Sequence, residues 1–221
     1  AEAATLAARV VGLDIAGIDI VAEDISRPLE AQRGAIVEVN AGPGLLMHLK
    51  PAKGKPRPVG QAIVDSLFPA GDKGRIPIVG IAGSKGTSLT ARLMSWLLQL
   101  TGKHVGLSCR DGLFLDKRMV DKRDCANWAA GQRLLINRSV DAAVFENGAA
   151  MILGEGIAYD RCQVGIVTDA TGFEALGEFD IHNAEQLYHV LRTQVDIVLP
   201  EGAAVLNAAD PLVARMAELC D

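Results

Sequence analysis

The sequence predicts an α/β fold whose larger part contains a mostly parallel sheet. From residue 76 onward, short β-branched apolar runs alternate with segments of helical periodicity, which is typical of strand and helix alternating along one sheet. Within that region, residues 76–98 combine an apolar run, a glycine-bearing turn and an apolar-periodic helix. With 49% hydrophobic and 22% charged residues among 221, the chain can bury a substantial core.

Residues 1–58 are predicted to form a separate, smaller module. A helix with Leu6, Val10 and Val11 on one face precedes strands at residues 17–22 and 35–39. Residues 59–75 form a linker with a short helix at 59–67, because proline, glycine and lysine are enriched on both sides of that helix. The second module then occupies residues 76–221.

Three polar side chains mark the strands of the first module. Glu38 and Asn40 are two residues apart and therefore share one face of their strand, and Asp19 joins them if the two strands pair. Carboxylate and amide oxygens are the ligands that Mg²⁺ prefers. The alternative is a solvent-facing strand surface with no metal, and the spacing alone leaves both open.

The turn within residues 76–98 is a candidate phosphate-binding loop. A tight turn that leads from a buried strand into a helix presents free N–H groups and the positive end of the helix dipole to an anion. The residues of the turn are Gly83, Ser84, Lys85, Gly86, Thr87 and Ser88. Their types suit such a loop, but the lysine precedes the second glycine instead of following it.

The remainder of the second module supplies the other expected elements. The helix after the loop is expected to pack one face on the core, with Leu89, Leu93, Trp96, Leu97 and Leu100 on it, and Trp128 is also expected to be a core residue. Strands are predicted at residues 104–109, 142–148, 164–169 and 203–210, with a hairpin at 112–120 and helices at 124–137, 184–196 and from Pro211. Ligands are expected at the carboxyl ends of the parallel strands.

Composition limits the classes of partner. A net charge of −5 and a pI near 5.4 argue against nucleic acid as a partner, and no apolar run is long enough to span a bilayer. Four widely spaced cysteines predict a reducing cytoplasm. We also expect a homo-oligomer. Because the chain opens without Met inside a predicted helix, we expect it to be a fragment of a longer protein.

Two stretches of the first module carry a family resemblance. The segments GLDIAGIDIVAED and AIVEVNAGPGL resemble the closing part of an ATP-grasp domain, in which an Asp and a Glu-x-Asn pair hold Mg²⁺. With GKPRPVGQAIVDSLFP they resemble, more narrowly, the cyanophycin synthetase family, which joins an ATP-grasp module to a Mur-ligase-like module. The resemblance implies ATP and Mg²⁺ as cofactors, with Asp19, Glu38 and Asn40 as metal ligands.

The second module resembles the central ATPase domain of Mur ligases, with several departures. Gly83, Ser84, Gly86 and Ser88 match the family's G-T-x-G-K-[TS] loop, but Thr87 stands where the catalytic lysine belongs. Lys85 either substitutes for that lysine or is a solvated loop residue. Glu146 matches a magnesium-binding Glu of that family, although Ala149 stands where the family has an Arg. Asp169 and Glu174-Ala175 stand where the family has an Asn and an Asp-His pair. Asn207 and Asp210 match family positions at the nucleotide.

The resemblance implies an ATP-dependent carbon–nitrogen ligase that makes the Asp-Arg polymer cyanophycin through an acyl phosphate. The missing lysine, the missing Arg near Glu146 and the missing Asp-His pair all belong to one expected pocket. We therefore expect the Mur-like module to keep its fold without efficient ATP hydrolysis. The preferred hypothesis is an enzyme that polymerises ready-made Asp-Arg dipeptides at its ATP-grasp site. The alternatives are a two-site enzyme that adds Asp and Arg separately with Lys85 rescuing the second site, and a Mur-like module that acts only as a structural or polymer-binding scaffold.

Overall fold

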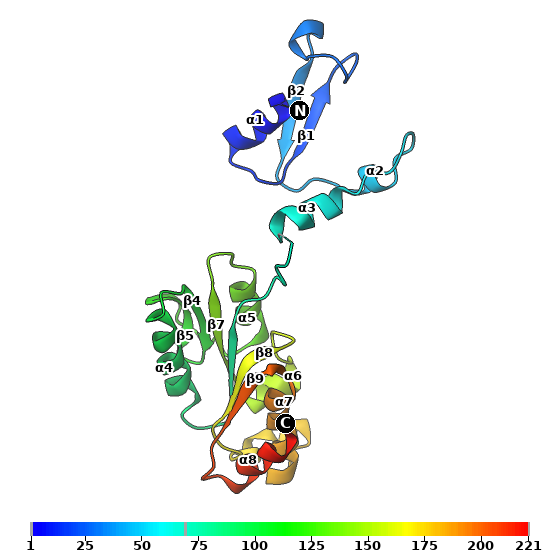
Figure 1. Cartoon of the computed structure of the whole chain (residues 1–221). Helices are drawn as coiled ribbons and strands as arrows, with labels where there is room; N and C mark the ends of the chain where they lie inside the picture. The colour runs from blue at the N-terminus through cyan, green and yellow to red at the C-terminus, as the bar shows by residue number, and fades with distance from the viewer. Residues whose placement is uncertain (1, 69, 221) are drawn as a thin grey trace. The chain divides into compact units, whose positions relative to one another are not determined.

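The chain divides into two compact units, Ala1–Gly74 and Arg75–Asp221. A computed structural model describes residues 2–68 and 70–220 (Figure 1). The division falls one residue before the predicted start of the second module at residue 76, and the predicted linker at 59–75 lies almost entirely in the first unit.

The first unit is a helix packed on a two-stranded sheet. Helix α1 (Glu2–Val11) contacts β2 (Ala35–Asn40), which pairs antiparallel with β1 (Gly17–Val21). Gly12 ends α1 in a left-handed conformation, φ +83°, as helix C-termini commonly do. The unit also contains η1 (Glu30–Gln32), α2 (Leu46–Leu49) and α3 (Val59–Leu67). The two strands and the helix at 59–67 are therefore confirmed.

The second unit is built on a seven-stranded sheet of order β6-β5-β4-β7-β3-β8-β9. Five neighbouring strands, β4 to β9 in that order, run parallel, while β5 and β6 form an antiparallel hairpin at the β4 edge. The mostly parallel sheet predicted from the alternation is confirmed. The strands are β3 (Ile78–Ala82), β4 (Val105–Cys109), β5 (Gly112–Leu115), β6 (Arg118–Asp121), β7 (Ala142–Asn147), β8 (Cys162–Val167) and β9 (Val198–Leu206).

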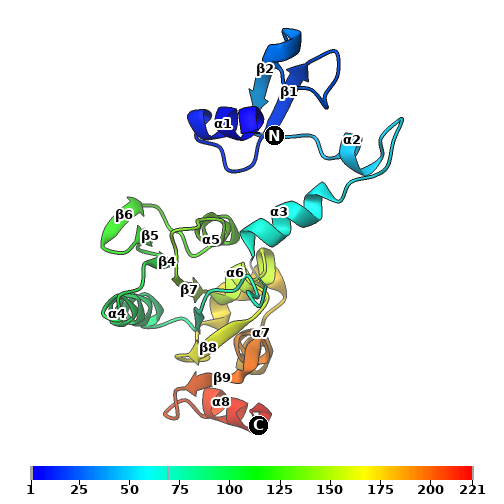
Figure 2. The same ribbon diagram turned by 45° about the horizontal axis from the view of Figure 1, so that its top comes forward.

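Helices cover both faces of this sheet. Helix α4 (Thr87–Gln99) lies on one face, and α5 (Trp128–Leu135) and α7 (Ala184–Asp196) lie on the other (Figures 1 and 2). Side chains alternate along β3, so that Val79 and Ile81 pack under α4 while Ile78 packs toward α5 and Ala82 toward α7. The shorter elements are α6 (Ala149–Gly154), η2 (Phe173–Phe179), α8 (Pro211–Arg215) and η3 (Met216–Leu219).

An ion pair fixes the start of the second unit. The guanidinium of Arg75 forms two hydrogen bonds with the carboxylate of Asp160, which lies two residues before β8. This contact lies at the amino ends of the parallel strands, and the pKa of Asp160 is lowered by it to about 2. The chain therefore enters the sheet at the amino ends of the parallel strands, and the loops that border the ligand pocket lie at their carboxyl ends.

A buried polar cluster lies against the central strand. Gln194 of α7 accepts hydrogen bonds from Asn147 (2.7 Å) and from the Tyr159 hydroxyl (3.0 Å), and the Asn147 amide also donates to that hydroxyl. Gly80 of β3 makes room for the cluster, because a Cβ there would overlap the Tyr159 hydroxyl oxygen and lie 2.5 Å from the Gln194 amide.

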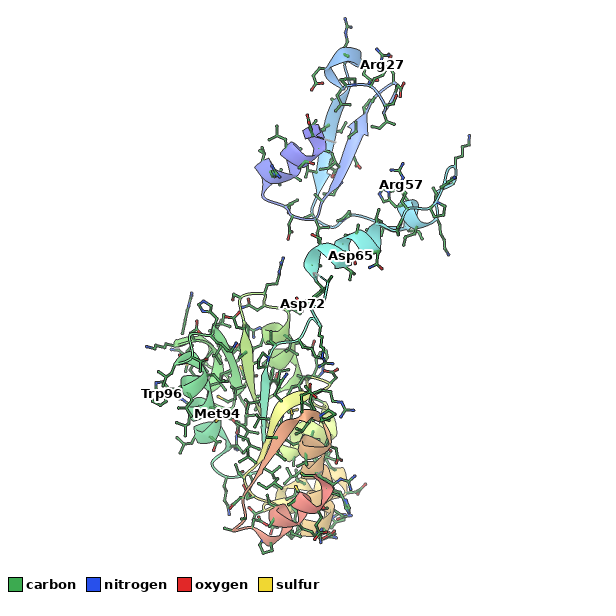
Figure 3. All side chains as sticks on the ribbon, viewed as in Figure 1. Arg27, Arg57, Asp65, Asp72, Met94 and Trp96 are labelled. Carbon is green, nitrogen blue, oxygen red and sulfur yellow. The ribbon has the colours of Figure 1, made fainter. Side chains whose placement is uncertain are left out.

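The prediction for the inner face of α4 is wrong. The five large apolar side chains expected in the core are exposed, Leu89 at 75% and Trp96 at 52%, and Trp96 points away from the sheet (Figure 3). The helix instead buries Thr87, Ala91 and Ser95, with Met94 and Leu98 partly buried beside them. Small side chains allow α4 to lie close to strands made of bulky residues, so its larger side chains turn outward. The five exposed residues are Leu89, Leu93, Trp96, Leu97 and Leu100.

Helix α5 is shorter than predicted, and Trp128 is not a core residue. Asn127 caps the helix by accepting a hydrogen bond from the Ala130 N–H, so residues 124–126 form a turn before it. Trp128 at the first helical position is 46% exposed. Within residues 2–68 and 70–220, no helix is long and apolar enough to cross a membrane.

Replacing Gly80 with Ala is expected to destabilise the second unit by about 3 kcal/mol, because the added methyl must displace Tyr159 or Gln194 from a saturated buried cluster. Urea unfolding of the 221-residue chain measures the effect. Gly177→Ala is the control, since a Cβ there meets no atom within 4 Å, and it should change the free energy of unfolding by less than about 0.5 kcal/mol. Equal stability of the two variants would contradict the described packing.

Candidate functional site

A pocket of about 300 Å³ opens at the carboxyl ends of the parallel strands of the second unit. Loops that follow β3, β4, β7 and β8 surround it, as expected for an open α/β sheet. Its polar wall includes Ser84, Arg110 and Thr171, and its apolar wall includes Leu187 and Leu191 of α7. The predicted phosphate loop therefore borders the pocket that the fold places where ligands bind.

The glycine-rich loop joins β3 to α4 as predicted. Gly83 and Gly86 both adopt positive φ, +137° and +70°, which side chains other than glycine rarely adopt. Gly86 is the N-cap of α4, and Thr87 is the first residue of the helix. The backbone thus has the strand, tight turn and helix start of an anion-binding loop.

The buried carboxylate of Glu146 accepts hydrogen bonds from the residues that end the glycine-rich loop and from Arg110. Glu146 lies near the end of β7 with its side chain 1% exposed, and its oxygens accept hydrogen bonds from the Thr87 hydroxyl (2.6 Å) and the Ser88 hydroxyl (2.8 and 3.0 Å). Arg110, directly after β4, donates both its backbone N–H and its Nε–H to the same carboxylate, each at 2.8 Å. Four donor groups from two segments, the first turn of α4 and the residue after β4, therefore converge on one buried carboxylate.

This donor set keeps Glu146 ionised. Burial alone would raise the pKa of Glu146, but the hydrogen bonds from Thr87, Arg110 and Ser88 outweigh it, so the pKa lies below its ordinary value. A metal ion needs oxygen ligands with lone pairs free, whereas hydroxyl, amide and guanidinium donors use those of Glu146. The residues around Glu146 do not fit a magnesium ion as they are arranged.

Position 87 holds a hydroxyl where the Mur-like pattern has lysine. Thr87 is 1% exposed, and its Oγ1 also accepts a hydrogen bond of 2.8 Å from the Arg110 guanidinium. The guanidinium reaches the carbonyl of Ser84 as well, at 3.5 Å. Lys85 is exposed, and its backbone N–H donates a hydrogen bond to the carboxylate of Asp169, in the loop after β8.

Asp169 occupies the other side of the loop. It follows β8 and is 8% exposed, and its Oδ2 accepts from the backbone N–H groups of Ser84 (3.0 Å) and Lys85 (2.9 Å). Its Oδ1 accepts from the Ser84 and Thr171 hydroxyls at 2.6 and 2.7 Å. Two backbone N–H groups of the loop, those of Ser84 and Lys85, are therefore bonded to a carboxylate of the same chain and are not available to an outside anion.

The remaining predicted positions of the second unit have structural contacts. Asn207 donates to the Thr168 carbonyl at 2.8 Å and accepts from Ala209, while Asp210 accepts from the Ala170 N–H at 2.8 Å and caps α8. Both side chains tie the end of β9 to the loop after β8. Ala149 begins α6 at the pocket wall, and Glu174-Ala175 lies exposed in η2.

The three predicted ligands of the first unit are brought together. Asp19 lies directly opposite Glu38 across β1 and β2, and Asn40 is two residues along the same strand, opposite Gly17. Opposed residues of an antiparallel pair share a face, so all three side chains project from one surface. Within the described part of the chain, no set of three or more His, Cys, Asp or Glu residues forms a metal cluster. Two opposed carboxylates with an amide oxygen nonetheless fit a hard divalent cation in their donor chemistry.

Arg110 is the residue that the sequence analysis missed. It follows a predicted strand by one position, which places it at the sheet edge where ligands were expected. That position was the available signal, but no motif of the Mur-like resemblance draws attention to it. Its contacts with Glu146 and Thr87 depend on the neighbouring positions of β4, β7 and β3, which only the strand order reveals.

Arg110→Ala is expected to lower the free energy of unfolding by about 2–3 kcal/mol, because it leaves a buried carboxylate without its cationic partner. Chemical denaturation at pH 7 measures the change. Arg92→Ala is the matched control: its side chain is 53% exposed against 51% for Arg110, but it pairs with the exposed Asp111, so its loss should cost no more than about 1 kcal/mol. Equal costs would show that the Arg110 pair is an ordinary surface contact.

Glu146 should also contribute a pH dependence. Its folded-state pKa lies below the value of 4.5 for an unperturbed Glu, so its stabilising effect is complete above about pH 5 and is lost as the pH falls through the folded pKa. The stability advantage of the natural chain over Glu146→Gln should therefore be constant from pH 7 to 5 and shrink below that. Paired denaturation curves across this range test it, and a difference that does not change down to pH 3 would contradict it.

Comparison with known proteins gives consistent findings. No protein-family model matches the chain. The chain is 43% identical over 211 residues to cyanophycin synthetase of Synechocystis sp., an alignment that covers 96% of this chain and 24% of that protein. It is 42% identical over 211 residues to cyanophycin synthetase of Crocosphaera subtropica, with the same coverage.

A solved structure identifies the fold. UDP-N-acetylmuramoyl-L-alanyl-D-glutamate–2,6-diaminopimelate ligase superposes with a TM-score of 0.54 over 72% of this chain and 31% of that chain, at 13% sequence identity. That likeness concerns the fold alone, and it agrees with the mostly parallel sheet. Over 96% of its length the chain is homologous to cyanophycin synthetases, and it spans about a quarter of the length of these curated relatives.

Proposed function

We propose that the chain is part of an ATP-dependent ligase that makes cyanophycin, and that its second unit does not transfer phosphate. The homology to cyanophycin synthetases supports the ligase assignment. The observation that carries the second statement is Glu146, whose carboxylate is saturated by four donor groups beside a threonine at the lysine position. Without a lysine, and without an open carboxylate for a metal, the site lacks the charges that stabilise phosphoryl transfer.

The chemistry then belongs to the ATP-grasp site, to which the first unit contributes one surface. In the proposed reaction a substrate carboxylate attacks the terminal phosphate of ATP, ADP leaves, and an amine displaces phosphate from the acyl phosphate to form the amide. Asp19, Glu38 and Asn40 would hold Mg²⁺, which neutralises phosphate charge when bound. The proposed substrates are Asp-Arg dipeptide and the growing polymer.

Substrate choice and site dependence test this proposal in the full-length parent. The parent should release ADP with Asp-Arg dipeptide and a cyanophycin primer, but not with free Asp plus free Arg. Asp19→Asn combined with Glu38→Gln should lower the rate at least about 100-fold, because the metal loses both carboxylates. Lys85→Ala should leave the rate within about twofold, since its side chain is exposed.

The opposite pattern supports the two-site alternative. In that case free Asp and Arg would be incorporated, and Lys85→Ala would abolish one of the two ADP-releasing steps.

A scaffold role for the second unit is the other candidate, and the exposed apolar face of α4 favours it, because soluble domains rarely leave five large apolar residues of one helix uncovered. Such a role also agrees with a homo-oligomeric parent.

A further inference from the structure

We propose that Asp169 is a built-in occupant of the glycine-rich loop, an internal carboxylate that takes the place of a phosphate and thereby excludes phosphate-bearing ligands from it. This inference rests on the proposed function and deepens it, because it names the group that closes the second site. Asp169 contacts the backbone of Ser84 and Lys85 at the start of the loop, whereas Glu146 contacts Thr87 and Ser88 at its end.

The first step is the saturation of Asp169. Its Oδ2 accepts from the Ser84 and Lys85 N–H groups and from the Thr168 hydroxyl (2.9 Å), and its Oδ1 accepts from the Ser84 hydroxyl and from the N–H (3.2 Å) and hydroxyl of Thr171. A carboxylate offers about four acceptor positions, so none remains unused. The side chain cannot turn away from the loop without leaving these donors unpaired in a mostly buried place.

The second step is the glycine at the start of the loop. A Cβ at Gly83 would overlap the Thr168 hydroxyl and lie 3.0 Å from Asp169 Oδ2. The absence of a side chain at this position therefore lets the end of β8 approach the loop, in the way that such glycines allow a phosphate to approach in nucleotide sites. The loop has the geometry of an anion-binding turn, and the anion is supplied by the same chain.

The third step is charge. Burial by itself would raise the pKa of Asp169, but the hydrogen bonds from Ser84, Thr171 and Lys85 lower it below the ordinary range of an Asp, so the group is ionised at neutral pH. Arg110 is the cation that lines the pocket, and its guanidinium is engaged with Glu146 and Thr87. An arriving phosphate would meet a fixed negative charge and occupied donors.

The experiment uses the 221-residue chain with inorganic pyrophosphate as the probe. EDTA is present, so that any cation site at Asp19 and Glu38 stays empty and cannot bind the probe. Titration calorimetry and thermal unfolding compare the natural chain with Asp169→Ala and with the isosteric Asp169→Asn. Asp160→Asn is the control, because it removes the same charge at the opposite end of β8 from a side chain that is 68% exposed.

The melting temperature of Asp169→Ala should be lower than that of the natural chain, and it should rise by several degrees when pyrophosphate binds the N–H and hydroxyl groups that Asp169 no longer occupies. The melting temperatures of the natural chain and of Asp160→Asn should not change with pyrophosphate. The affinity of Asp169→Ala for pyrophosphate should exceed that of the natural chain by at least about tenfold. If the alanine variant does not fold, Asp169→Asn decides by the same comparison, because its amide keeps the shape and loses the charge. Equal affinities, or no binding by any variant, overturn the proposal.

The result is separable from the test of the proposed function. Equal pyrophosphate affinities would mean only that another feature closes the loop, and the dipeptide reaction of the parent could still depend on Asp19 and Glu38 alone. Conversely, ADP release by the parent that depends on Lys85 would contradict the proposed function, regardless of the affinity of the 221-residue chain for pyrophosphate. The two measurements therefore fail independently.

Discussion

A single buried carboxylate, Glu146, is the constraint around which the site of the second unit is arranged. An isolated ionised carboxylate at this depth would be costly, and two neighbouring segments supply donors to it. The first turn of α4 contributes hydroxyls, and the residue after β4 contributes a guanidinium and a backbone amide. The position of the helix start, the strand end and the arginine are thus consequences of satisfying one charge.

The glycine-rich loop lies between this carboxylate and a second one, Asp169. Ligand sites of this kind normally leave backbone donors for a substrate, whereas here the N–H groups of Ser84 and Lys85 bond to Asp169 and the Thr87 hydroxyl bonds to Glu146. Saturation of this kind favours a stable loop in the absence of nucleotide. It also separates two properties that the strand-turn-helix pattern usually combines, the architecture of the turn and its affinity for anions.

The sequence predicted most of the architecture because buried parallel strands and their helices leave clear periodic patterns. It did not predict the orientation of α4. Leu89 and Trp96 belong to a regular apolar stripe of the kind that usually faces a core, whereas the small residues that are buried, Ala91 and Ser95, form no such stripe. The sequence placed Asp19 beside Glu38 and Asn40 only on the condition that the two strands pair, and the structure shows that they do, with Asp19 opposite Glu38. The roles of Arg110 and Asp169 could not be predicted, because their partners are 23 to 85 residues away in sequence and meet only through the strand order.

The ion pair between Arg75 and Asp160 ties the start of the second unit to the segment that precedes β8. This contact lies near the amino ends of β3 and β8, whereas the glycine-rich loop lies at the carboxyl end of β3, about five residues further along at roughly 3.3 Å per residue. The hydrogen-bonded ladders between β3, β7 and β8 resist shear over that length. Two parallel ladders therefore hold β3 between its neighbours along its length, so the glycine-rich loop begins from a strand that is fixed on both sides.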